Sequence, residues 1–555
     1  MKRHARMIMM FIGSLVGSLV VAWSAPSLAR EAATAPTGLD RYIAKADDSY
    51  SWKTISKKSA DGMTTYVLEM ASQTWRGPDE VDRPVWRHWL TVVVPDQTKT
   101  DIGLLWIGGG RNGGDPPKRS SDIVERVARA VGTVAAELRM VPNQPLVFHN
   151  DGVPRSEDDL IGYTWDQFLK TGDATWPARN PMVKSAVRAM DTMTALTARE
   201  QGGKHRVDKF VVAGGSKRGW TTWLTGAVDQ RVVAIVPIVI DVLNIKPSMK
   251  HHHAAYGFWS PAVGDYVQHR IMERLDLPRM DELAKLVDPY HYRHRLTMPK
   301  YIVNAAGDQF FLPDSSRFYF DELSGEKYLR YIPNADHSQK GTDALESIAA
   351  FYWLIVHDKS RPRFSWQEDE DGSFRVTTVD APAEVRLWQA TNPAARDFRL
   401  ESLGPKYTSR LLEDQGGGVY VAHVAKPAKG WTAFFVELTY DVGAPFPVKF
   451  TTNVHVTPDV LPHADEDPSR AATITLRCES PSEEVAQRIV DQVGALLKKH
   501  HLSANDAVAR RRGTACRINW QPVGRFRKSA ATLTEWLEQQ GCSNFRYELH
   551  SGSED

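Results

Sequence analysis

The chain has 555 residues, more than a typical single domain of about 100–250 residues, so its length predicts several domains. The formal net charge of +2 argues against a nucleic-acid-binding protein and against an acidic interaction tail. The apolar share of 42% is typical of an ordinary globular protein and excludes a largely disordered chain.

The first 29 residues have the order of a secretory signal peptide. The basic start "KRHAR" precedes the apolar run "MIMMFIGSLVGSLVVAW", and Ser27 and Ala29 are small residues with the spacing of a cleavage site. An uncleaved membrane anchor is the alternative, because the run is almost long enough to span a bilayer. We predict cleavage after Ala29 and export to the periplasm or the outside of the cell, with no stable membrane insertion afterwards.

Residues 30–360 alternate between apolar runs and helical periods, which predicts a mostly parallel sheet buried on both faces. Ser120 or Ser121 is the expected N-cap of the first helix, and the second has Asn180 as its expected N-cap with Pro181 at its first position. The expected strands are 66–75, 86–95, 101–110, 132–141, 208–215, 232–241, 300–308 and 327–334, and the expected helices are 120–131, 180–200, a helix from 217, and 341–358.

The pattern changes near Pro362. Residues 361–462 contain short strand-like runs and turn signals without a long helical period, which predicts a small β-sandwich-like domain. A polar linker, "PHADEDPSR", leads to residues 470–555, which we expect to form a small α+β module. This module holds all three cysteines, Cys478, Cys516 and Cys542; export permits a disulfide, a reactive thiol is possible, and buried unpaired cysteines are the simpler interpretation.

The stretch "VVAGGSKRG" places Ser216 where a predicted buried strand turns directly into a helix. Such a turn is the nucleophile elbow of serine hydrolases, in which a sharp bend exposes the serine hydroxyl. Gly214 and Gly215 relieve crowding at the bend, and Gly219 lets the helix approach the strand. The usual pattern has glycine two residues after the serine, whereas Arg218 stands there; the elbow can still form if Arg218 points outward. A glycine-rich turn with an incidental serine is the alternative.

A catalytic serine needs a base and an orienting acid, which follow it in this order in α/β-hydrolases: serine, acid, histidine, each after a strand. Asp308 and His337 follow two later predicted strands in this order, although each alone fits a turn or loop residue. Asp241, at the end of 232–241, is the rival acid. We predict Ser216, His337 and Asp308 as the triad, on the spacing and the fuller match of order.

An oxyanion hole would combine the amide of Lys217, at the start of a helix, with an amide from the loop after the third strand. That loop is "GGGRNGGD", where Gly109 and Gly110 are the main candidates. A flexible turn is the alternative, and a phosphate-binding loop fails because no Gly-Lys-Ser/Thr ending follows.

Residues 242–298 form a predicted insertion of the kind that serves as a lid, and we expect Trp220, Tyr256 and Trp259 to contact substrate unless they belong to the interior of the lid. Three adjacent histidines, 251–253, do not converge in a regular element, so no metal site is predicted there. The segment "RSEDDL", 155–160, is expected to be a solvated loop or a helix start. No cofactor is implied.

Several motifs together resemble the PhoPQ-activated pathogenicity-related protein family over roughly residues 40–462: "GGSKRGWTTW", "NAAGDQFFLPDSS", "YIPNADHS", "SQTW", "GYTWDQFL" and "PMVKSAVRAMD". This family is similar to α/β-hydrolases, and its serine, aspartate and histidine match Ser216, Asp308 and His337. The elbow, with glycine third after the serine, also resembles that of glucuronoyl esterases. The family name records regulation and specifies no substrate.

Two classes of function remain open. The first is an exported serine hydrolase, with a small-molecule or acyl ester as a better candidate substrate than a peptide, because no peptide groove is specified. The second is a binding protein on a hydrolase scaffold, against which the complete triad argues. The expected architecture is an α/β-hydrolase fold followed by the sandwich-like domain and the α+β module.

Overall fold

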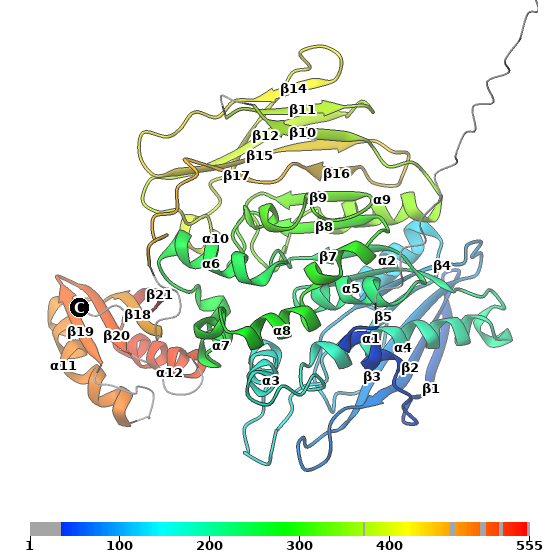
Figure 1. The fold of residues 1–555 in the computed structure, drawn as a ribbon, viewed down its shortest axis with the longest axis horizontal. Coiled ribbons are helices and arrows are strands. Elements are labelled where there is room, and N and C mark those ends of the chain that lie inside the picture. Colours follow the sequence, from blue (N-terminus) through cyan, green and yellow to red (C-terminus); the bar gives the residue numbers. More distant parts are fainter. Residues whose placement is uncertain (1–34, 370–371, 467–471, 500–506, 521–525, 552–555) are drawn as a thin grey trace, which may run out of the picture.

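A computed structural model describes residues 35–369, 372–466, 472–499, 507–520 and 526–551 (Figure 1). The predicted signal peptide and the cleavage after Ala29 lie outside these ranges. None of the helices within them has the length and apolar character needed to cross a bilayer.

The largest sheet is mixed, with parallel and antiparallel strands. Its first part has the strand order β1-β2-β3-β5-β4-β6-β7-β8-β9. Strands β5, β4, β6, β7, β8 and β9 run parallel, while β3 pairs antiparallel with β5. This arrangement, with β4 and β5 exchanged in order, is the α/β-hydrolase fold. The bounds are β1 Ser51–Ala60, β2 Met63–Thr74, β3 Val85–Pro95, β4 Ile102–Ile107, β5 Ala135–Leu138, β6 Lys209–Gly215, β7 Val232–Ile238, β8 Lys300–Ala305 and β9 Lys327–Ile332.

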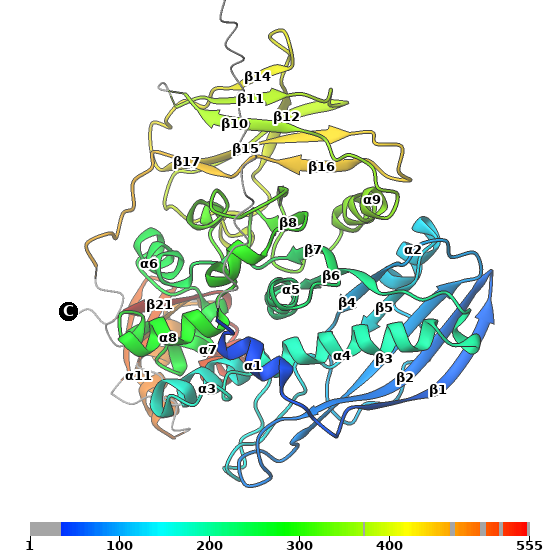
Figure 2. The same cartoon turned by 45° about the vertical axis from the view of Figure 1, so that its right-hand side comes forward.

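Helices cover both faces of this sheet, which explains the near-continuous apolar runs of its strands. On β6, Phe210 and Val212 pack with the helices of one face, whereas Val211 and Ala213 pack with those of the other. The first face carries α4 Arg179–Thr197 and α5 Lys217–Val228, and the second carries α2 Asp122–Val131 and α9 Ala344–Val356 (Figure 2). Helix α1 Gly38–Ala44 packs on α4, and α3 Glu157–Thr171 joins the same apolar core without covering the strands.

Two helix starts differ in detail from expectation. Helix α4 begins at Arg179 with Ala178 as its N-cap, so the predictions of Asn180 as the cap and of Pro181 at the first position are both wrong. Asn180 lies inside the first turn, where its side-chain amide donates instead to the carbonyl of Ala174. Helix α2 has Ser121 in the N-cap position, one of the two predicted serines, although its hydroxyl makes no capping hydrogen bond.

The predicted lid insertion is a group of short helices between β7 and β8. Its elements are α6 Ile245–Tyr256, η2 Pro261–Val263, α7 Gly264–Gln268, η3 Met272–Arg274, α8 Pro278–Val287 and η4 Pro289–Arg295. The insertion lies to one side of α5, which contacts η4 of the lid (Figure 2).

The β-rich segment continues the hydrolase sheet, because β16 pairs with β9 and leads to β15, β12 and β13. A second sheet, β10-β11-β14, faces this extension. The ring centroids of Phe374 in β11 and Phe434 in β15 are 5.3 Å apart. The two facing sheets are sandwich-like, but one of them is shared with the hydrolase part. The bounds are β10 Phe364–Glu368, β11 Phe374–Thr378, β12 Glu384–Asn392, α10 Leu400–Leu403, β13 Thr408–Leu411, β14 Val419–Ala422, β15 Trp431–Tyr440, β16 Val448–Thr451 and β17 His455–Thr457.

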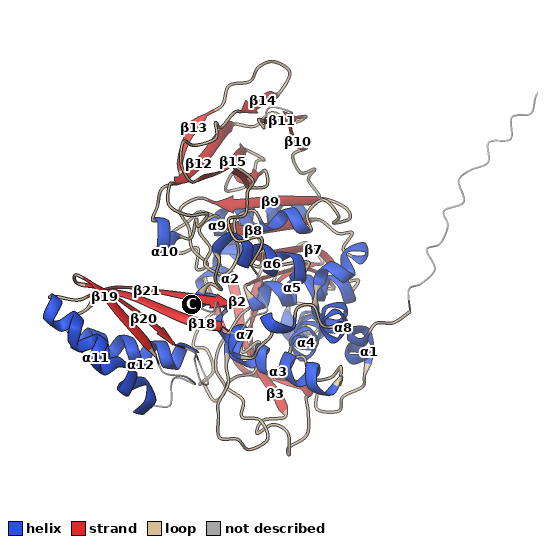
Figure 3. Cartoon of the chain, turned by 60° about the vertical axis from the view of Figure 1, so that its left-hand side comes forward, coloured by secondary structure: helices blue, strands red, loops and turns tan. Residues whose placement is uncertain are grey.

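The tail is a four-stranded antiparallel sheet, β19-β20-β18-β21, with two helices packed on it (Figure 3). Its own apolar interior includes Ile474, Ile489 and Leu533. Among the described elements it touches the rest of the chain mainly at α7 and η2. The bounds are β18 Ala472–Glu479, α11 Glu483–Lys499, β19 Val508–Arg512, β20 Ala515–Trp520, α12 Phe526–Gln539 and β21 Ser543–Ser551.

We predict that a chain ending at Pro462 folds without the tail. The tail has its own sheet and apolar interior, so its loss leaves the hydrolase sheet and its β16–β9 pairing intact. The expected result is a monodisperse protein with one cooperative melting transition, measured by size exclusion and calorimetry beside the full-length chain. Aggregation of the truncated protein alone would show that the tail covers apolar surface of the lid.

Candidate active site

Ser216 occupies a strained bend between β6 and α5, with φ 57° and ψ −124°. A side chain at Gly214 would meet the backbone of Arg218 at 2.9 Å, and one at Gly219 would meet the carbonyl oxygen of Ile238 at 2.8 Å. Both glycines are therefore required for the strand and helix to approach each other. The bend has the form of the predicted nucleophile elbow, and it leaves Ser216 half-buried.

Arg218 does not point outward, and the bend forms with its side chain held inside. Its Nη1 and Nη2 each donate to Glu157 at 2.9 Å, and its Nε donates to the carbonyl of Val141 at 2.6 Å. The guanidinium lies against Gly109, where an added Cβ would be 2.7 Å from Nη2. Arg218 thus fills the space beside the elbow and links it to the loop after β4.

The three amides predicted for an oxyanion hole lie in two segments that Arg218 connects. The amide of Lys217 is the first in α5 and so lacks an acceptor within the helix. In the loop after β4, the carbonyl of Gly109 accepts from the amide of Met140 at 2.9 Å. The carbonyl of Gly110 accepts from the side chain of Gln144 at 3.1 Å, and its φ of 139° favours glycine. This loop is therefore held by hydrogen bonds and is not an open turn.

Asp308 and His337 meet after β8 and β9. Nδ1 of His337 donates to Oδ2 of Asp308 at 2.7 Å, and the carboxylate, only 4% exposed, also accepts from the amide of Phe310 at 2.7 Å. This bond leaves Nε2 as the basic nitrogen of the ring. Nε2 is buried and has no hydrogen-bond partner within the described ranges, so it is not hydrogen-bonded to Ser216 in this structure. Such bonds commonly tighten only when substrate binds.

Phe310 and Phe311 place His337 on the same side of the fold as Ser216. Their ring centroids lie 4.3 and 6.0 Å from the centroid of the imidazole ring. Both side chains also line a cavity that Ser216 lines. The structure thus brings the Asp308–His337 pair and Ser216 to the carboxyl edge of the sheet, where open α/β sheets bind ligands.

Asp241, the rival acid, lies in a different set of contacts. Its two carboxylate oxygens accept hydrogen bonds from Tyr319 and Tyr331, each at 2.6 Å. Complete burial raises the pKa of Asp241 to about 7, although the two phenol hydrogen bonds oppose that shift. The structure places Asp308, and not Asp241, against His337.

Behind the elbow lies an ion cluster that the sequence analysis missed, formed by Glu157, Asp158, Lys217 and Arg218. Nζ of Lys217 lies 2.8 Å from Oδ2 of Asp158 and 3.1 Å from Oε2 of Glu157. Tyr266 of α7 donates to the other oxygen of Asp158 at 3.0 Å. Burial raises the pKa of Glu157, but the hydrogen bond from Arg218 and the charge of Lys217 outweigh it and hold that pKa well below its usual range.

The carboxylates of this ion cluster come from "RSEDDL", which was expected to be a solvated loop or a helix start. Glu157 does begin a helix, α3, but that first turn is directed at the first turn of α5. The sequence signal was the match between two adjacent acids and two adjacent bases, Lys217 and Arg218. Their separation in sequence concealed their proximity.

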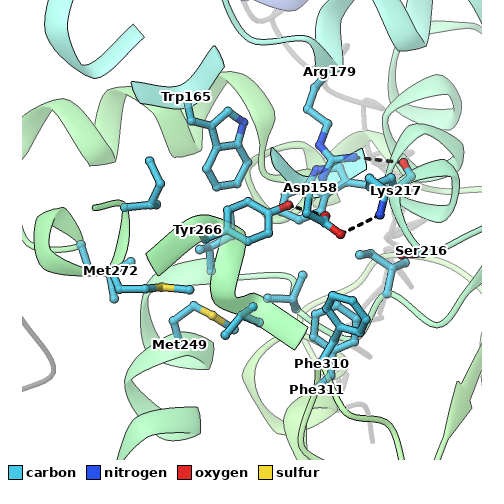
Figure 4. Close-up of a pocket in the computed structure, with 17 residues that line it drawn as sticks. Asp158, Trp165, Arg179, Ser216, Lys217, Met249, Tyr266, Met272, Phe310 and Phe311 are labelled. Carbon is cyan, nitrogen blue, oxygen red and sulfur yellow. Dashed lines mark hydrogen bonds and ion pairs between the residues drawn. The ribbon is translucent and has the colours of Figure 1, made fainter. Parts of the chain in front are cut away.

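A small cavity of about 50 Å³ opens beside Ser216 (Figure 4). Trp220, one of the three residues predicted to contact substrate, lines it. The other two predicted contacts, Tyr256 and Trp259, do not line this cavity: Tyr256 borders a separate hollow together with Arg399, and Trp259 is buried with its ring stacked on His252 at 5.7 Å. Trp259 therefore belongs to the interior of the lid.

The three adjacent histidines are also part of the lid interior. Nε2 of His251 lies 3.0 Å from Asp314, and Nε2 of His252 accepts from the amide of Ser260 at 3.1 Å. Burial lowers the pKa of His252 well below its usual value. The structure holds no group of three or more potential metal-ligating side chains in the portion of the chain that it describes.

We predict that Asp158→Asn destabilises the protein by about 3 kcal/mol, because it removes one partner of a buried ion pair and leaves Lys217 undercompensated. Asp276→Asn is the matched control, since Asp276 pairs with Lys250 at 2.9 Å but its side chain is 63% exposed, and it should cost less than about 1 kcal/mol. Urea denaturation measures both. Equal free energies of unfolding for the two variants would contradict a structural role of the ion cluster.

Solved structures of two esterases resemble part of this chain. Acetyl xylan esterase 1 from Thermoanaerobacterium sp. is 16% identical with a TM-score of 0.40, and the match covers 58% of this chain and 92% of that one. A glucuronoyl esterase from Solibacter usitatus is 14% identical with a TM-score of 0.31, over 54% of this chain and 86% of that one.

Matches by sequence cover a larger share of the chain. Autocrine proliferation repressor protein A of Dictyostelium discoideum is 40% identical over 458 residues, which is 77% of this chain and 91% of that protein. The PhoPQ-activated pathogenicity-related protein family matches residues 39–399, a range that includes Ser216, Asp308 and His337. The chain therefore belongs to the PhoPQ-activated pathogenicity-related protein family.

Proposed function

We propose that this protein is an exported serine esterase with Ser216 as nucleophile, His337 as general base and Asp308 as the acid that orients it. The observation that carries the proposal is the 2.7 Å hydrogen bond between His337 and Asp308, at the sheet edge where Ser216 occupies its strained bend. A buried carboxylate on Nδ1 fixes the tautomer that leaves Nε2 free to accept the serine proton.

The reaction follows acyl transfer in two halves. Ser216 attacks the ester carbonyl while Nε2 of His337 takes its proton, and Asp308 stabilises the imidazolium that forms. The amides of Lys217 and of Gly109 or Gly110 are the proposed donors to the oxyanion. His337 then protonates the departing alcohol, and a water activated by the same nitrogen releases the acid and restores Ser216.

An ester is a better candidate substrate than a peptide. The cavity beside Ser216 is small and mainly apolar, which suits one acyl group better than a run of peptide side chains. Export rests on the sequence of residues 1–29 alone.

A second candidate is a regulatory binding protein on a hydrolase scaffold, and the name of the Dictyostelium relative favours it. That relative is named as a repressor of proliferation, which describes regulation and no hydrolysis. Folds do not determine function, so a site of this form could have been retained for binding. The two candidates differ in one measurable property, the reactivity of Ser216.

We predict that a fluorophosphonate probe labels the protein once and that Ser216→Ala abolishes labelling. His337→Ala should nearly abolish it, since the hydroxyl then keeps its proton. Asp308→Asn should slow it by about 10⁴-fold through the wrong histidine tautomer. Labelling rates are read from gel fluorescence over time.

Asp241→Asn is the matched control, because Asp241 is a buried carboxylate that contacts tyrosines and not His337. It should leave the labelling rate within about 10-fold of wild type. If Asp241→Asn slows labelling more than Asp308→Asn does, the assignment of Asp308 as the acid is wrong, but the proposal of a serine esterase is unaffected. If folded wild-type protein takes up no probe and cleaves no short-chain ester, the binding protein becomes the better candidate.

A further inference from the structure

The cavity beside Ser216 is closed by apolar side chains from the lid and from the strand ends. Met249 of α6, Met272 of η3 and Leu275 are each at most 6% exposed, and Trp165 of α3 is 2% exposed. Figure 4 shows Ser216 and Met272 on opposite sides of the space that these residues enclose. A group attached to Ser216 would therefore enter a short, closed space.

Three charged side chains border the cavity: Asp158 and Lys217 pair with each other, while the buried Nε of Arg179 has no hydrogen-bond partner among the described residues. Asp158 contacts Lys217 and Tyr266, and Arg179 donates to the carbonyl of Lys217 at 3.1 Å while stacking on Trp220 at 4.2 Å. What remains facing the space is mostly hydrocarbon and aromatic surface. An uncharged acyl chain is stabilised by burying its methylene groups in such surroundings.

The volume of the cavity limits the length of that chain. An apolar cavity of about 150 Å³ holds one benzene molecule, with its six carbons. The space beside Ser216 is about 50 Å³, a third of that volume. By this proportion it holds roughly two carbon atoms.

We propose that this cavity is the acyl pocket and that it restricts the enzyme to esters of short, uncharged acids, acetyl or propionyl, with Met249 and Met272 setting the limit. The inference rests on the proposed esterase function and adds the substrate class. The alcohol would lie outside the cavity, because Ser216 itself is only half-buried. Methionine side chains are flexible and can be shortened without a polar group being introduced.

The experiment measures kcat/KM for p-nitrophenyl acetate, propionate, butyrate, hexanoate and octanoate. Wild type should prefer acetate or propionate over hexanoate by at least about 10-fold, since one excess methylene in a pocket changes the rate by about 10–200-fold. Met272→Ala should raise the hexanoate-to-acetate ratio by about 10-fold or more. Met249→Ala is the second variant, should the first fail to fold.

Met193→Ala is the matched control, because Met193 of α4 is a fully buried methionine that does not line the cavity. It should lower stability and leave the chain-length ratio unchanged. Labelling of Ser216 together with a wild-type preference for octanoate would overturn the acyl-pocket inference and leave the esterase. Absence of both labelling and ester cleavage would overturn the two together.

The cysteines of the tail carry a second, independent inference. Cys478 of β18 and Cys516 of β20 are directly paired residues of antiparallel strands, and both are 3% exposed. Directly opposite residues have Cα atoms about 4.5–5.5 Å apart, within the range that a disulfide spans. Cys542 comes just before Ser543, which pairs with Glu479 on the other side of β18.

We infer that Cys478 and Cys516 form a disulfide under oxidising conditions and that Cys542 stays reduced beside it. With glutathione disulfide as oxidant, one cysteine thiolate attacks a glutathione sulfur and releases one glutathione. The second cysteine thiolate then displaces the other glutathione from the mixed disulfide. Two protein thiols are oxidised, one glutathione disulfide is reduced to two glutathiones, and these carry the two protons.

Full-length protein equilibrated in glutathione redox buffers, quenched in acid, unfolded and alkylated, should give a linked Cys478–Cys516 peptide and an alkylated Cys542 by mass spectrometry. Cys542→Ser should keep the linked peptide, and Cys516→Ser should lose it. Three alkylated cysteines at every buffer ratio, or a Cys478–Cys542 link in wild type, would overturn the inference.

Discussion

The ion pairs between the first turn of α3 and the first turn of α5, of which the Lys217–Asp158 pair is buried, are the constraint on which the site depends. Lys217 and Arg218 immediately follow Ser216, so any movement of Glu157 and Asp158 would move the elbow. Buried pairs of this kind cost desolvation and tolerate little misalignment. Their contribution is to fix a geometry, and here they fix the backbone of a residue with positive φ.

The same ion cluster connects separate parts of the chain. Arg218 extends from the elbow to the loop that holds Gly109, and Tyr266 connects Asp158 to the lid. The cavity beside Ser216, the proposed oxyanion donors and the proposed nucleophile therefore share one support. This explains why a cationic residue can replace the usual glycine of the elbow motif without loss of the bend.

The sequence was sufficient to predict the parallel strands, because strands buried on both faces are continuous apolar runs. It was also sufficient to predict the order of Ser216, Asp308 and His337, because ligands bind at the carboxyl ends of such strands. The Asp308–His337 contact followed from that order. Arg218 and Asp158 could not be placed, since their side chains are fixed by partners about 60 residues away. Trp259 was ambiguous for a related reason: aromatic residues suit a lid interior and a pocket wall equally well.

The pairing of β16 with β9 has a further consequence for assembly. The last strand of a hydrolase sheet otherwise presents unpaired amides and carbonyls, a template on which another chain can add a strand. Here that edge is covered by the chain's own β16, and the sheet continues through β15 and β12 to β13. Another chain therefore cannot add a strand to β9, and the free edge on this side of the sheet is β13 instead. The β-rich segment thus protects the strand that immediately precedes His337 from association with other chains.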